Sequence, residues 1–215
     1  MTEAELFQFY QDKFKPIYAD LVVAEGEKFL EIDAQIESAM SHLALAKTSA
    51  DTVVVQSNLE SACGHVGRAC LDAVKLLWDN RKAKVDKIMG DDLIRRFGGN
   101  ASESRLWELH TLAERLAREA RHQDTAGAGH NASELVIKYY DSVNTYQEIL
   151  DSMDWEKTKQ VEQFRIIYTI KQQLTGFLLG ILAGIISSVL VTLWAWKYLP
   201  PSSPPTQTTI QDIKK

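Results

Sequence analysis

The sequence predicts an all-α protein, in which a cytoplasmic bundle of long helices is followed by one C-terminal transmembrane helix. Two patterns favour this fold class. Apolar residues recur every three or four positions through most of the chain, which is the spacing of helices that bury one face. Near the C-terminus, the 23 residues 174–196 include no charged side chain. No segment alternates apolar and polar residues as a half-buried strand does.

Composition and charge are those of an ordinary folded chain. The 215 residues suit one domain with an appendage, and the net charge of −5 gives no reason to expect nucleic acid as an obligatory partner. The opening residues are acidic and lack an apolar run, so we do not expect a secretory signal there. Cys63 and Cys70 lie two helical turns apart, about 10 Å, which is too far for a disulfide and indicates buried thiols.

Breaks in the apolar pattern define the first helices. Pro16 is expected in the first turn of a helix that continues to residue 46 and ends at 47–51. A long second helix is expected to end near Met89, Gly98-Gly99 interrupts the chain, and further helices cover about 102–120 and begin again near Ala132. The predicted core positions are Phe29, Ile32, Ile36, Ala39, Leu43, Ala46, Val54, Ala62, Cys63, Val66, Ala69, Ala73, Leu77, Trp78, Leu106, Leu109, Ala113, Leu116, Ala120, Val136, Tyr139, Val143, Tyr146, Leu150 and Met153.

The quartet Asn-Ala-Ser-Glu occurs twice, at 100–103 and at 131–134. Outside a membrane, each would contain a glycosylation sequon. Inside, each is a helix start, with Asn100 (or Ser102) and Asn131 as caps and a Glu three residues after each Asn to close a capping box. The topology that follows from the charges near the membrane segment favours helix caps at both sites.

The last helix is expected to run unbroken from about 132 to 198, since neither glycine nor proline occurs between Gly129 and Gly176. The alternative is a break near 151–159, where the apolar spacing thins. This gives a helical bundle over 1–154 and a juxtamembrane helix over 155–173, continuous with its neighbours. A transmembrane helix over 174–198 and a disordered, proline-rich extracytoplasmic tail over 199–215 complete the chain.

The uncharged stretch is long enough to cross a membrane. At about 1.5 Å per residue it spans roughly 34 Å, against a hydrocarbon core of ~30 Å. Aromatic residues at its far end are typical of an interfacial belt: Trp194, Trp196 and Tyr198. Four cations lie in the twenty residues before it, whereas the fifteen after it hold only Lys197. The positive-inside rule predicts a single-pass protein of the inner or plasma membrane with its N-terminal part in the cytoplasm.

Small residues gather on one side of this predicted span, and we call them the small face: Gly176, Gly180, Ala183, Gly184, Ser187 and Ser188. Small residues four apart let helices approach closely in lipid, where packing drives association. They predict a homo-oligomer. Glycine is also common in membrane helices, so a plain anchor is the alternative. A pore would need a polar lining, for which the candidates are Thr175, Ser187, Ser188 and Thr192.

Motifs of catalysis are scarce. The chain has no glycine-rich phosphate loop, HExxH, CxxC or GxSxG pattern, and its five histidines show no metal-ligand spacing. We therefore expect no metal or cofactor and lean away from an enzyme.

Two stretches resemble the HEPN superfamily of small helical bundles, over roughly residues 20–150. "RLAREARH" places six residues between Arg115 and His122, similar to the family's Arg-x4–6-His signature, although Leu116 replaces the usual polar residue. The resemblance implies a dimer whose Arg115 and His122 form a ribonuclease site, or an inactive module that binds RNA or a nucleotide. In residues 58–77, His65, Arg68 and Asp72 share one side of a helix. They are a candidate ligand-binding site, and otherwise a buried polar trio that packs helices.

These features together predict a membrane-anchored, self-associating helical effector that perturbs or permeabilises the membrane on activation. Its outline is similar to that of membrane-anchored HEPN-like accessory proteins of bacterial antiphage systems, including those that accompany CRISPR nucleases. That likeness implies RNA, a nucleotide or a defence-system protein as a partner. The alternatives are a membrane-tethered HEPN-type ribonuclease and a tail-anchored helical adaptor or tether.

Overall fold

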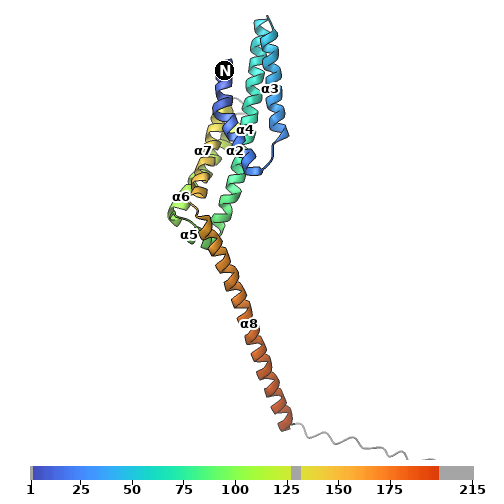
Figure 1. The fold of residues 1–215 in the computed structure, drawn as a ribbon, viewed down its shortest axis with the longest axis vertical. Coiled ribbons are helices and arrows are strands. Elements are labelled where there is room, and N and C mark those ends of the chain that lie inside the picture. The colour runs from blue at the N-terminus through green and yellow to red at the C-terminus, as the bar shows by residue number, and fades with distance from the viewer. Residues whose placement is uncertain (1, 127–131, 199–215) are drawn as a thin grey trace, which may run out of the picture. The chain divides into compact units, whose positions relative to one another are not determined.

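The computed structural model describes residues 2–126 and 132–198, and its regular elements are helices (Figure 1). They are α1 (Glu3–Phe9), the π-helix η1 (Tyr10–Phe14), α2 (Lys15–Glu25), α3 (Leu30–Thr48), α4 (Thr52–Gly90), α5 (Asp92–Phe97), α6 (Glu103–Ala126), α7 (Ala132–Asp151) and α8 (Trp155–Tyr198). The described residues contain no strand, only an isolated bridge between Gly99 and Met153. The all-α prediction is confirmed. The chain forms two compact units, one up to Val161 and one from Glu162 onward.

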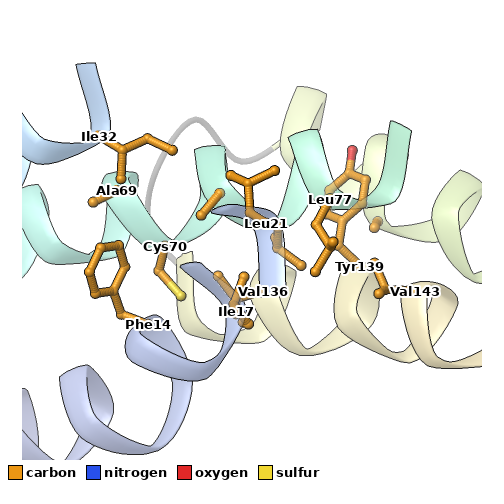
Figure 2. Close-up of a cluster of buried hydrophobic side chains, with 13 residues drawn as sticks. Phe14, Ile17, Leu21, Ile32, Ala69, Cys70, Leu77, Val136, Tyr139 and Val143 are labelled. Atoms are coloured by element: carbon orange, nitrogen blue, oxygen red, sulfur yellow. The ribbon is translucent and has the colours of Figure 1, made fainter. Parts of the chain in front are cut away.

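The first unit is a bundle built around α4. Helices α2, α3 and α7 all pack along α4, and α6 packs on α7. Figure 2 shows the largest apolar cluster, in which side chains from η1, α2 and α3 meet the buried faces of α4 and α7. Its labelled members are Phe14, Ile17, Leu21, Ile32, Ala69, Cys70, Leu77, Val136, Tyr139 and Val143. The thiols of Cys63 and Cys70 are free, as expected from their spacing.

Most predicted core positions are buried, but Phe29, Ile36, Cys63 and Trp78 are only partly buried. In α6 the buried stripe contains Ala117, while the predicted Leu116 is only partly covered. Near the start of α4, the predicted Val54 is exposed. The stripe of α7, from Val136 to Leu150, is buried as predicted.

The helix expected to continue from Pro16 to residue 46 is instead two helices. Pro16 lies in the first turn of α2, as predicted, but α2 ends at Glu25. Gly26 follows with φ of 78°, a left-handed conformation that glycine adopts without the steric penalty of a side chain. Phe29 is the extended residue before α3 and not a member of a continuous helix.

The capping prediction for the first Asn-Ala-Ser-Glu quartet is wrong for Asn100 and right for its alternative, Ser102. Ser102 Oγ accepts a hydrogen bond from the backbone N–H of Arg105 at 3.2 Å, and α6 begins at Glu103. Asn100 is engaged elsewhere, since its side-chain oxygen accepts a hydrogen bond from Lys157 Nζ at 2.8 Å and its backbone N–H donates to the carbonyl of Ser152. The second predicted cap, Asn131, lies outside the described residues.

The helix expected to run unbroken over 132–198 is interrupted, and the break lies where the alternative placed it. α7 ends at Asp151 and α8 begins at Trp155. The carboxylate of Asp154 accepts hydrogen bonds from the backbone N–H groups of Glu156 and Lys157, both at 3.1 Å, so it caps α8. From Trp155 onward α8 is one helix of 44 residues.

Candidate functional site

The apolar part of α8 differs from every bundle helix in what surrounds it. Within the described residues, it alone is long and apolar enough to cross a membrane, and no residue of its most apolar 18-residue window is buried. Large apolar side chains are exposed all around it, among them Phe177, Leu179 and Ile186. Thr158 is the only residue of α8 that is buried.

The small face lies on this exposed part of α8. A methyl group built on Gly176, Gly180 or Gly184 would meet no atom within 4 Å outside the helix itself. Ala183, Ser187 and Ser188, the other members, are also exposed. The small face is therefore available to another molecule, and no described residue of this chain covers it.

A short backbone contact joins the start of α8 to the corner between α5 and α6, and we call it the joint (residues 98–100 and 152–158). The N–H of Asn100 donates to the carbonyl of Ser152, and the N–H of Asp154 donates to the carbonyl of Gly98, both at 2.9 Å. The hydroxyl of Thr158 also donates to the Gly98 carbonyl, at 3.2 Å. The joint fixes the first turn of α8 to the bundle.

Both glycines of the joint are required by close packing. A Cβ on Gly98 would lie 2.6 Å from the carbonyl oxygen of Ile94 and 3.0 Å from Thr158 Oγ1. A Cβ on Gly99 would lie 3.0 Å from the carbonyl oxygen of Ser152. In the sequence these glycines indicate only a helix break, and their role in holding α8 is seen only in the three-dimensional structure.

Arg115 and His122, the two residues of the HEPN-like signature, are both exposed on α6. They are two helical turns apart on one face, roughly 10 Å along the axis. This is an accessible position for a partner or a second copy. Their catalytic role stays a prediction.

His65, Arg68 and Asp72 do not form the buried polar trio that was the alternative to a ligand site. His65 is half-buried against α3, where its Nδ1 donates to Gln35 Oε1 at 2.7 Å and its ring stacks on His42 with centroids 5.3 Å apart. Partial burial, followed by the charges of Arg68 and His42, lowers the pKa of His65. Arg68 and Asp72 are exposed, and no ion pair joins them among the described residues. Ligand binding by the three stays a prediction.

The structure shows a polar cluster that sequence reasoning missed. Lys82 Nζ of α4 pairs with Glu114 of α6 and, at 3.1 Å, with Asp86. Tyr146 of α7 donates its hydroxyl to Glu114 at 2.7 Å, and His110 Nε2 lies 3.3 Å from Asp86. Burial alone would raise the pKa of Glu114, but the hydrogen bonds from Lys82 and Tyr146 outweigh it and lower that pKa.

This cluster contains the atoms of a possible cation site, but a lysine already lies among them. One ligand atom each from Asp86, His110 and Glu114 lie within 4.8 Å of one another. The ammonium of Lys82 pairs with both carboxylates, so a metal ion would have to displace it. The geometry is that of an ion-pair network which ties α4, α6 and α7 together.

No protein-family model, curated protein sequence or solved structure matches this chain.

Proposed function

We propose that this protein is a membrane-anchored helical effector whose copies associate through the small face of α8. In this proposal α8 crosses the inner or plasma membrane once and the bundle lies in the cytoplasm. On activation, the assembled helices perturb or permeabilise the membrane. The HEPN-like resemblance suggests bacterial antiphage defence as the setting, with RNA, a nucleotide or a defence-system protein as the activating partner.

The exposure of α8 carries this proposal. Burying a large apolar side chain stabilises a protein by about 1.5–3 kcal/mol relative to leaving it in water. α8 exposes such side chains on all sides from Phe164 to Tyr198. A helix this apolar needs a bilayer or other protein around it. The joint ends at Thr158, sixteen residues before the uncharged stretch begins, and leaves that stretch free to enter lipid.

The small face supports self-association in particular. Lipid chains are as apolar as leucine, so helices in a membrane gain little from burying large side chains against each other. They gain from backbone approach, which Gly176, Gly180 and Gly184 permit because nothing in the chain occupies the space beside them. The hydroxyls of Ser187 and Ser188 would then hydrogen-bond between copies.

Gly180→Leu tests the proposal. The substitution keeps the span apolar, so insertion is expected to be normal, while the added side chain separates helices that meet at the centre of the small face. Crosslinking in native membranes, followed by sizing in detergent, should show a smaller assembly. Loss of membrane potential on expression should be abolished together with it. Leu178→Ala, on the opposite side of the helix, is the control and should retain both.

A normal assembly and full effect for Gly180→Leu would contradict the proposal. In that case α8 is an anchor, and function belongs to the bundle as an adaptor, tether or ribonuclease. Topology is checked independently: a reporter before Met1 should be cytoplasmic, and one after Lys215 should be outside.

A further inference from the structure

A groove on the bundle lies between the N-terminal helices and α3, far along the chain from α8. α1 and η1 form one wall with Leu6, Phe7, Tyr10 and Gln11, and α3 forms the other. Its volume is about 440 Å³, within the range of small-molecule sites. The groove is part of the bundle alone, so what it binds is independent of how α8 associates.

The floor of the groove is buried and its mouth is apolar and open. Ala39 and Val66 are buried at the base, whereas Phe7 and Met40 at the mouth are 45% and 57% exposed. No charged side chain lines it within the described residues. Methionine and aromatic side chains at an open mouth suit an apolar ligand, because both present large, adaptable surfaces.

One wall of the groove belongs to the π-helix η1. Tyr10 and Gln11 are the first two residues of η1, and both line the groove. A π-helix has a wider turn than an α-helix and is rare, and such segments are frequent at functional sites.

A cation lies at the end of the groove marked by Gln11. The ammonium of Lys15 donates to Gln11 Oε1 at 3.1 Å, and Lys15 is exposed. The nearby carboxylate of Asp12 accepts a hydrogen bond from Gln8. The site thus combines an uncharged apolar groove with a positive charge beside its polar end.

We propose that this groove binds the aliphatic chain of a single-chain anionic amphiphile, a free long-chain carboxylate, whose head pairs with Lys15. The wall on α3 runs from Ile36 to Leu43, two helical turns or about 10 Å, which matches the part of one extended chain nearest its head, and the rest of the chain leaves through the open mouth. A protein partner is less suited, because a stable interface needs about 800 Å² from each side.

The test uses the full chain in phosphatidylcholine nanodiscs with a free fatty acid that carries a photoreactive diazirine on its chain. After illumination, mass spectrometry should find the label on peptides that contain Phe7 and Met40. Met40→Glu puts a charge at the exposed mouth without disturbing the core, and should reduce this labelling at least about tenfold. Val23→Glu is the matched control, because Val23 is exposed on α2 outside the groove, and should label normally.

Lys15→Gln separates the two parts of the site. Loss of an exposed ion pair should weaken the apparent affinity for the fatty acid about fivefold, without moving the labelled positions. A second arm places the same diazirine in the chain of phosphatidylglycerol within the nanodisc. Labelling of the groove by this lipid, and not by the free fatty acid, would overturn the proposed ligand. Label that reaches only α8, or that Met40→Glu and Val23→Glu affect equally, would overturn the groove itself.

Discussion

Helices α7 and α8 are separated by three residues, yet they are built for different surroundings. α7 has one apolar face, whose residues from Leu135 to Leu150 are buried, and a polar face toward water. α8 from residue 174 to 196 carries no charge, exposes apolar side chains on all sides and buries none of them. α7 finds its partners within the chain, and α8 needs partners that the chain does not supply. Substitutions in the bundle and in α8 should therefore have different effects on stability.

The largest expected effect is a loss of stability when leucine is replaced by alanine in the bundle core, and the same replacement in α8 should have none. Leu77 of α4 is fully buried, so Leu77→Ala should lower the free energy of unfolding of the bundle by about 2–5 kcal/mol. Leu182→Ala, at a site 57% exposed in α8, should leave the bundle unchanged. Urea unfolding followed by tryptophan fluorescence in detergent measures both. A matching loss for Leu182→Ala would show that α8 is a core helix of a soluble protein, and would break the comparison.

The next largest loss of stability is expected from a substitution in the joint, which connects the bundle to the first turn of α8. Gly98→Ala introduces a methyl group against the Ile94 carbonyl and should cost about 1–3 kcal/mol. Gly90→Ala is the matched control, since a Cβ there meets nothing within 4 Å. It should be neutral or stabilising by about 0.5–1 kcal/mol. Equal stabilities of the two variants would show that the joint is open in solution.

The polar cluster predicts a pH dependence that belongs to the bundle alone. The pKa of Glu114 lies below its ordinary 4.5, because hydrogen bonds from Lys82 and Tyr146 outweigh the effect of burial. A lowered carboxyl pKa stabilises the fold above pH 4.5, and this contribution is lost as the pH falls through the folded-state pKa. Glu114→Gln should therefore be less stable at pH 7, by about 1 kcal/mol, and change less between pH 5 and 3.

The control for this measurement is Glu119→Gln, at an exposed position on the same helix. It should follow the wild type across the whole pH range. A Glu114→Gln variant with an unchanged acid limb would mean that other carboxylates govern acid unfolding.

The smallest effect is expected at the HEPN-like pair. Arg115 and His122 are exposed, so replacing either with alanine should change the free energy of unfolding by less than about 0.5 kcal/mol. Under the proposed function both variants keep their effect on the membrane. Loss of RNA cleavage in both, with the fold and assembly unchanged, would move function from α8 to the bundle and favour the ribonuclease alternative.

Apolar periodicity predicted the features of the fold that are set by the sequence of a single helix. The stripes of α4 and α7 and the apolar length of α8 are properties of single segments, and a helix with one such stripe buries it whatever its partner. The break at Ser152–Asp154 contains no glycine or proline, so an unbroken helix was the main prediction, and the thinning of the apolar spacing gave the break only as the alternative. The residue in the sequence that indicates the start of a new helix there is Asp154, because aspartate is a favoured N-cap.

The polar cluster could not be predicted in the same way. Lys82 and Asp86 form an ordinary pair four residues apart on one helix, and His110 and Glu114 have the same spacing on another. Nothing in the sequence of either pair indicates that the two pairs lie in contact in the folded protein. The packing of α4 and α6 with α7 decides it, through the single hydroxyl of Tyr146 and the reach of Lys82.

The joint also has a consequence for the order in which the chain folds. It connects Gly98 to Thr158, sixty positions apart, and closing so long a loop directly is entropically costly. Once α6 and α7 have paired as a hairpin, that loop is already short. We therefore expect the first turn of α8 to become fixed after α6 and α7 have paired. Until then the apolar segment is joined to the bundle by a loose connection, and it can reach its final surroundings before its base is locked.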